Sequence, residues 1–262
     1  PKNVGLMFFN MEPDKFFPYT QIDVVQFPEG LGGNNIIEQT FKGPIHQQLR
    51  EALQYIRNSI ITEKVVKHSD RPEADRFFNY PLAAIEEALS NAVYHRGYDE
   101  REPIEVRVEN DKIEIVSFPG PDRSVTLEGL KSFHVSNRRY RNRRIGDFLK
   151  ELHLTEGRNT GFKKILDALE ANGSPKPEFE TDEARSYFIS RFYIHEKFQN
   201  VPKKEPKKSQ KGAEKELKKG VERKKIILKL LEENPTMTQT QLTERLKLTR
   251  KQIQTDVKEL RG

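Results

Sequence analysis

The sequence has no cysteine and no tryptophan, and no long apolar run interrupts its 262 residues. The absence of cysteine excludes disulfide bonds, thiol nucleophiles and cysteine-ligated zinc sites. No stretch approaches the roughly 18 apolar residues that a membrane-spanning helix requires, and no signal-peptide pattern is present. We therefore expect a soluble, cytoplasmic protein without a membrane partner.

The signatures of several enzyme classes are also missing. No Gly-x-x-x-x-Gly-Lys-Ser/Thr phosphate loop occurs, so this chain contains no helicase motor. The Gly-x-Ser-x-Gly motif of serine hydrolases is absent. The six histidines show no paired metal-ligand spacing, which argues against a zinc enzyme.

The positive charge of the chain is concentrated in one segment. The net charge is +6, yet residues 199–225 alone hold eleven Lys or Arg against four Glu, a net of +7. Residues 1–198 hold 28 basic and 31 acidic residues. The segment is typical of a solvated tether, and an added contact with DNA phosphates is the alternative. We predict a domain over 1–198, a lysine-rich linker over 199–225 and a second domain over 226–262.

The first 195 or so residues alternate between helical and strand periodicity, which predicts an α+β fold. Val4 to Phe9 is apolar without a preceding cap, and we expect the chain to begin within a longer protein. We predict strands over 22–27, 36–41, 104–108, 113–115 and 187–194, with a turn at 110–111, and helices over 45–60, 81–96 and 162–169.

Three short amphipathic helices are expected after the linker, with a tight break at Lys247-Leu248. This spacing is typical of a helix-turn-helix, and a small bundle for protein contacts is the alternative. The chain ends where the wing strands of a winged helix would begin, so the domain would be a truncated winged helix. The third helix would present to double-stranded DNA the side chains of Arg250, Lys251, Gln252, Gln254, Thr255 and Lys258.

Glu87, Asn91 and His95 are spaced to share one face of the helix predicted over 81–96. A carboxylate and a carboxamide at this spacing could position a water molecule and hold one Mg²⁺ coordination site. The alternative for this spacing is an exposed, solvated helix face.

The surrounding residues add a resemblance. Residues 84–96 (AIEEALSNAVYHR) resemble the N-box helix of the GHKL ATPases, a family that includes gyrase, MutL and histidine kinases, and a hairpin and a glycine turn follow as they do there. The run from Leu6 to His195 resembles the C-terminal domain of Schlafen/AlbA-type transcriptional regulators, often labelled RecG-like helicase C-terminal. Matching segments include 41–44, 113–121, 141–145, 155–161, 172–175 and 180–183. The resemblance implies a GHKL-like two-layer sandwich, normally preceded by an AlbA-type domain that this chain lacks.

The resemblance also implies roles for individual residues. Glu87 would be the general base that orients the attacking water, and Asn91 would hold Mg²⁺. The turn over 117–120 would receive adenine, but the aspartate that reads the adenine amino group is missing, and Asp122 is the nearest carboxylate. The remaining residues of an ATP site would be His95, Gly120, Gly157, Arg158, Gly161 and Lys163. The alternative for the glycines is an ordinary turn and helix start.

These patterns predict a DNA-binding transcriptional regulator whose first domain senses a nucleotide or forms a homodimer. A slow Mg²⁺-dependent ATPase and a degenerate fold that only supports assembly are the alternatives. Five arginines between Arg138 and Arg144 stand apart. They suit a lid, a subunit contact or a DNA phosphate contact, or form a solvated face.

Overall fold

The computed structural model describes residues 2–135, 139–155, 161–199 and 234. The chain divides into two units, Pro1–Asn200 and Val201–Gly262. The fold described below is that of the first unit. Apart from residue 234, the predicted tether beyond residue 199 and the predicted helix-turn-helix lie outside the described residues, so their boundaries stay predictions.

A six-stranded sheet forms one layer of this unit, with the strand order β2-β1-β5-β6-β8-β7. Neighbouring strands are antiparallel except β1 and β5, which are parallel and pair Ile22 with Ile104. The strands are β1 (Ile22–Gln26), β2 (Ile37–Phe41), β5 (Ile104–Val108), β6 (Lys112–Ser117), β7 (Glu178–Glu180) and β8 (Phe188–Tyr193).

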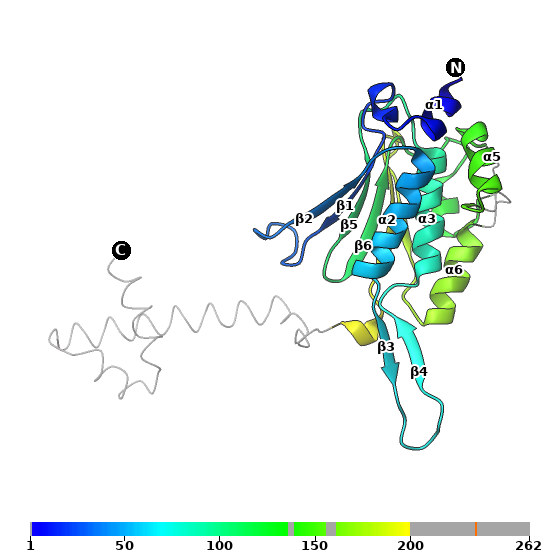
Figure 1. Cartoon of the computed structure of the whole chain (residues 1–262). Helices are drawn as coiled ribbons and strands as arrows, with labels where there is room; N and C mark the ends of the chain where they lie inside the picture. The colour runs from blue at the N-terminus through cyan, green and yellow to red at the C-terminus, as the bar shows by residue number, and fades with distance from the viewer. Residues whose placement is uncertain (1, 136–138, 156–160, 200–233, 235–262) are drawn as a thin grey trace. The chain divides into compact units, whose positions relative to one another are not determined.

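Helices form the second layer, and α2, α3 and α6 lie side by side over one face of the sheet (Figure 1). The described helices are α1 (Asn3–Phe9), α2 (Ile45–Ser59), α3 (Leu82–His95), α4 (Leu127–Lys131), α5 (Arg143–Glu151) and α6 (Gly161–Asn172), with short 3-10 turns η1 (Pro13–Lys15) and η2 (Glu196–Phe198). Within the described residues, no helix is both long and apolar enough to cross a membrane.

The core lies between these two layers. Val106, Ile113 and Ile115 point from the sheet toward the helices, where they meet Ile85 and Leu89 of α3, and all five are at most 1% exposed. Side chains alternate across a strand, so one apolar stripe per strand suffices to build this layer. The predicted α+β two-layer fold is thereby confirmed.

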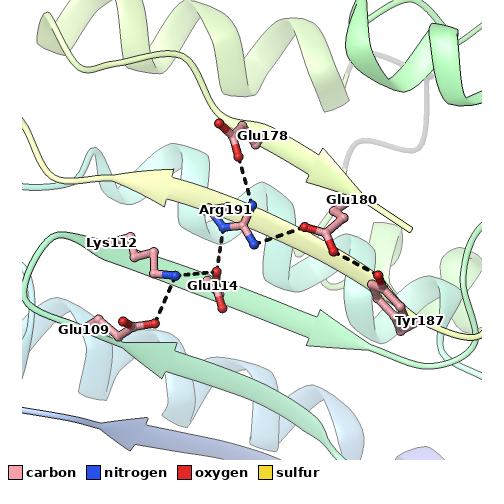
Figure 2. A network of polar contacts seen from close by, with 7 residues as sticks. All are labelled: Glu109, Lys112, Glu114, Glu178, Glu180, Tyr187 and Arg191. Atoms are coloured by element: carbon pink, nitrogen blue, oxygen red, sulfur yellow. Dashed lines mark hydrogen bonds and ion pairs between the residues drawn. The ribbon is translucent and has the colours of Figure 1, made fainter. Parts of the chain in front are cut away.

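The opposite face of the same strands carries a charged network (Figure 2). Arg191 of β8 donates to the buried carboxylate of Glu114 on β6 at 2.6 Å, to Glu178 at 2.9 Å and to Glu180 at 3.2 Å. Lys112 lies 2.9 Å from Glu114 and 3.2 Å from Glu109, and the Tyr187 hydroxyl donates to Glu180 at 2.9 Å. The network joins β6, β7 and β8 through side chains, in addition to their backbone ladder.

The predicted strands and helices of the sandwich are found within one or two residues of their expected ends, apart from the last helix, which runs to Asn172. Several described elements were not predicted. They are helices α1, α4 and α5, the short edge strand β7, the 3-10 turns, and a separate hairpin of β3 (Glu63–Val66) and β4 (Asp75–Phe78). In Figure 1 the hairpin projects away from the sheet. Its strands are largely exposed and do not alternate cleanly between apolar and polar residues, so periodicity gives no signal.

The end of α3 is fixed by a buried arginine that sequence reasoning treated only as a helix boundary. Arg96 is 1% exposed and donates to the backbone carbonyls of Glu102 at 2.7 Å and Tyr19 at 2.9 Å. Its guanidinium also lies 5.0 Å from the centre of the Tyr98 ring. Burial lowers the pKa of Arg96, but its carbonyl partners satisfy the donors that burial removes from water. This anchors the helix end beside the pocket described next.

Candidate functional site

A pocket of about 440 Å³ lies between α3, the start of α6 and the strands β6 and β8. Its volume falls within the range of small-molecule sites in proteins. One part is apolar and includes Ile115, Phe162 and Phe179, and another carries charged and polar side chains from α3 and from the segment after residue 138. The pocket therefore suits a ligand with a flat apolar part and a charged part.

Glu87 and Asn91 both line this pocket from α3. The Asn91 side-chain nitrogen donates to Glu87 Oε1 at 3.1 Å, and Lys164 Nζ lies 3.5 Å from Glu87 Oε2. Glu87 is only 7% exposed. The alternative of a solvated helix face is therefore wrong for Glu87: α6 packs against α3 and covers this stripe.

Gly161, the first residue of α6, comes close to this pair. A Cβ added to Gly161 would lie 2.8 Å from Glu87 Oε1 and 3.1 Å from the Asn91 side-chain nitrogen. A side chain at position 161 would displace the ends of the Glu87 and Asn91 side chains, so glycine lets the start of α6 approach them in their present positions. Unpaired backbone N–H groups at a helix start favour anions, so the approach brings an anion-binding element beside a carboxylate and a carboxamide.

The chemistry of these donors fits Mg²⁺ held together with a phosphate. Asn91 engages Glu87 through its amide nitrogen, and its amide oxygen is the atom that could hold a cation. Among the described residues, no group of three or more His, Asp or Glu lies close enough to hold a metal ion by itself. Mg²⁺ commonly takes one or two protein oxygens and completes its shell with water and substrate phosphates.

His95 lies at the far end of the same helix face. Its ring stacks on Tyr94 at 4.9 Å and on Tyr140 at 5.8 Å between ring centres. Burial, with a smaller contribution from the positive charge of Arg141, lowers the pKa of His95 to about 4. The imidazole is therefore neutral at physiological pH and can both donate and accept a hydrogen bond to a ligand.

Part of the arginine cluster lies at the rim of the pocket, where Arg139, Arg141 and Arg143 line it. Arg141 donates to the carbonyl oxygen of Gly120 at 3.0 Å and also to the carbonyl oxygen of His95. These hydrogen-bond partners are neutral carbonyls, and the carboxylates of Asp99, Asp122 and Glu100 act on Arg141 through longer-range attraction. By contrast, Arg144 pairs with Asp147 on an exposed surface, and Arg138 lies outside the described residues.

The turn expected to receive adenine also lines the pocket, through Ser117, Pro119, Gly120 and Asp122. The Asp122 carboxylate accepts from the Ser124 side chain and, at 3.0 Å, from the Ser124 backbone N–H. These bonds lower the pKa of Asp122. A Cβ on Gly120 would lie 2.6 Å from Thr181 Oγ1, so close packing alone accounts for that glycine.

Of the other predicted site residues, Lys163 lies away from the pocket, and the rest lie outside the described residues. Lys163 pairs with Asp167 on the outer side of α6 and is not among the described residues that line the pocket. Its neighbour Lys164 contacts Glu87 instead. The two lysines differ in the direction in which they project from α6, which is set by the burial of Ile165 and Leu169. Gly157 and Arg158 lie outside the described residues, as do the predicted DNA contacts Arg250, Lys251, Gln252, Gln254, Thr255 and Lys258.

Comparisons with known proteins agree with this architecture. Residues 101–189 match the family described as "Putative ATP-dependent DNA helicase recG C-terminal", and residues 222–261 match "Winged helix-turn-helix DNA-binding". The chain thus contains a region similar to the RecG C-terminal family and, after it, a region similar to winged helix-turn-helix domains. The predicted RecG-like and helix-turn-helix resemblances are confirmed. Neither match names Schlafen or AlbA, and that part of the resemblance stays a prediction.

Solved structures give the same fold. The crystal structure of the DIP2311 protein from Corynebacterium diphtheriae is similar, with a TM-score of 0.59 and 20% sequence identity. The match covers 98% of this chain and 49% of that one, so the present chain spans about half of its structural relative. A comparison with curated proteins found no match. The family match begins at residue 101, after α3, and the roles of Glu87 and Asn91 therefore depend on geometry.

Proposed function

We propose that this chain is a transcriptional regulator that binds DNA through its winged helix-turn-helix and binds a nucleotide, with Mg²⁺, in the pocket of its ATPase-like domain. Occupancy of the pocket would change how the helix-turn-helix engages DNA. The same proposal places the protein in the cytoplasm. The observation that carries it is the close approach of Gly161, at the start of α6, to Glu87 and Asn91.

The charges around that approach support a polyphosphate ligand. Arg139, Arg141, Arg143 and Lys164 supply positive charge on or beside the pocket. When bound, Mg²⁺ would neutralise phosphate charge, and Asn91 would be its protein ligand. The start of α6 would also stabilise a negatively charged ligand, because the N-terminus of a helix carries partial positive charge.

Helix α6 provides a route from the pocket to the end of the domain. It begins at Gly161 and ends at Asn172, whose side chain exchanges two 2.8 Å hydrogen bonds with the backbone of Phe78 on β4. The next residue inward, Phe77, stacks on His195 with 4.6 Å between ring centres. The chain continues from His195 toward residue 200. A shift of α6 would therefore move the residues that lead into the predicted tether.

The direct test is the binding of the full chain to labelled double-stranded DNA, measured by fluorescence anisotropy with and without ATP and Mg²⁺. We expect affinity to fall steeply with salt and to change by about tenfold on adding nucleotide. Arg250→Ala should reduce the salt slope by about one, whereas Gln252→Ala should reduce the preference for the specific site. DNA affinity that is unaffected by these substitutions and by nucleotide would contradict the proposal.

A second candidate function is slow Mg²⁺-dependent ATP hydrolysis, which the position of Glu87 favours. Its carboxylate is buried and lines the pocket beside Asn91, where it could accept a proton from an attacking water. Phosphate release should then fall by at least about 100-fold in Glu87→Ala while ATP still binds. Hydrolysis that survives this substitution would exclude Glu87 as the base.

We also propose that the regulator acts as a homodimer, because helix-turn-helix proteins commonly pair to read two half-sites. Sedimentation analysis should give twice the chain mass. A dimer whose mass and DNA affinity do not change when ATP is added would instead favour a role in assembly alone. A protein that binds DNA as a monomer would contradict the proposed dimer.

A further inference from the structure

Two buried serines form the polar part of the pocket floor. Ser117 of β6 and Ser190 of β8 are 5% and 4% exposed, and both line the pocket. Ser190 pairs with Ile115 across the strands, and Ser117 lies two residues farther along β6, so both side chains share the face of Ile115. Among the described residues, neither serine hydroxyl group has a hydrogen-bond partner.

Flat apolar surfaces surround these hydroxyls. Phe162 meets Phe179 edge-on with 4.6 Å between ring centres, and Phe179 stacks on Phe188 at 5.9 Å. All three rings line the pocket, as do Ala88 and Ala92 of α3. A pocket that combines apolar rings with two hydroxyl groups is suited to a planar heteroaromatic base, whose faces are apolar and whose edge is polar.

The carboxylates of the pocket are engaged elsewhere. Among the described residues that line it, the acidic side chains are those of Glu87 and Asp122. Glu87 is held by Asn91 and Lys164 at the start of α6, and Asp122 accepts the hydrogen bonds of Ser124. A carboxylate can only accept hydrogen bonds, whereas a hydroxyl group can both donate and accept.

We infer that Ser117 and Ser190 read the base of the bound nucleotide, and that the pocket therefore takes adenine and guanine nucleotides with similar affinity. The inference rests on the proposed nucleotide site. An amino group at the purine edge would donate to a serine, and a carbonyl group at the same position would accept from it. The site thus recognises the ring and the phosphates of a purine nucleotide, and it distinguishes only weakly between the amino group of adenine and the carbonyl group of guanine.

The test compares ATP and GTP, each with Mg²⁺, by calorimetric titration into the full chain and its variants. In the wild type we expect the two dissociation constants to agree within about threefold. Ser117→Asp introduces an acceptor-only group, which should weaken GTP and raise the ATP preference to at least about tenfold. Ser59→Asp adds the same charge on an exposed helix end away from the pocket and should leave the ratio unchanged.

Ser117→Ala keeps the inference testable if Ser117→Asp does not fold. It should weaken ATP and GTP alike by about threefold to tenfold, as the loss of one hydrogen bond does. A wild-type preference for ATP of tenfold or more, especially one lost in Asp122→Asn, would overturn the role of the serines while leaving the nucleotide site intact. If the folded wild type binds neither nucleotide, the proposed function itself fails.

Discussion

The two faces of the β6–β8 strand pair hold charged clusters of different character. On the face away from the helices, the buried Glu114 has two cationic partners within 3 Å, Arg191 and Lys112. On the helix side, the nearest cation to the equally buried Glu87 among the described residues is Lys164, at 3.5 Å. The arginine Arg141 beside the pocket donates to neutral carbonyls.

The difference separates a structural role from a binding role. Charges that satisfy one another within the fold hold strands together and need no ligand. Charged side chains around a pocket whose partners are distant or neutral are stabilised by a ligand that carries the opposite charge. The outer face should therefore control stability, and the pocket face should control binding.

The largest expected effect is on the outer face. Arg191→Met removes the shared partner of Glu114, Glu178 and Glu180 and leaves the carboxylate of Glu114 buried with Lys112 alone. We expect the free energy of unfolding to fall by about 3 kcal/mol, as measured by urea denaturation. Arg144→Met, which breaks the exposed pair with Asp147, should cost less than about 0.5 kcal/mol. Equal losses in the two variants would contradict a structural role for the network.

A matched pair of substitutions compares the two buried glutamates directly. Glu114→Gln should lower the free energy of unfolding by about 2 kcal/mol, because Arg191 and Lys112 both lose a charged acceptor. Glu87→Gln should change it by less than about 0.5 kcal/mol, because the longer ion pair offsets little of the cost of burying the charge. The comparison fails if the same urea titrations show Glu87→Gln to be the more damaging change.

We proposed that α6 transmits the effect of the bound nucleotide to the predicted tether. The residues of the outer face take no part in this. Asn172→Ala removes the two hydrogen bonds that join the end of α6 to β4. ATP and DNA should each still bind, but the effect of ATP on DNA affinity should shrink from about tenfold to about twofold. Glu180→Gln, on the outer face, should leave that effect intact. Unchanged coupling in Asn172→Ala, measured by fluorescence anisotropy, would show that α6 does not transmit the effect of ATP through Asn172.

The smallest effect concerns His95 and pH. Its pKa of about 4 in the folded chain lies below the ordinary value of 6.5, so the unfolded chain binds the proton more readily between these values. Stability attributable to His95 therefore rises as pH increases through this window and is complete above about pH 6.5. Between about pH 5.5 and pH 6.5, the wild type should gain about 1 kcal/mol more than His95→Gln. Parallel pH profiles for the two proteins would show that His95 does not titrate in this way.

Local sequence patterns predicted most of the sandwich, because its strands alternate and its helices carry apolar stripes. The same reasoning missed α5, whose many arginines were interpreted only as a charged cluster, although Ile145 and Leu149 give it a buried side. Hairpin β3–β4 was missed because its strands are mostly exposed.

The site was predicted in part. The spacing of Glu87 and Asn91 placed both on one helix face, and the structure brings Gly161 to them. The contributions of Lys164, Ser117 and Ser190 depend on how α6 and the strands β6 and β8 pack around the pocket. Spacing along the chain carries no information on such long-range contacts, so these residues required the fold.

The central claim is that the pocket face binds a nucleotide and the outer face does not contribute to that binding. It is tested most directly by calorimetric titration of ATP with Mg²⁺ into the full wild-type chain, Asn91→Ala and Arg191→Met, each shown to be folded by circular dichroism. The account predicts binding that weakens at least about tenfold in Asn91→Ala and stays within about twofold in Arg191→Met. Absence of binding in the wild type, or equal loss in both variants, would contradict it.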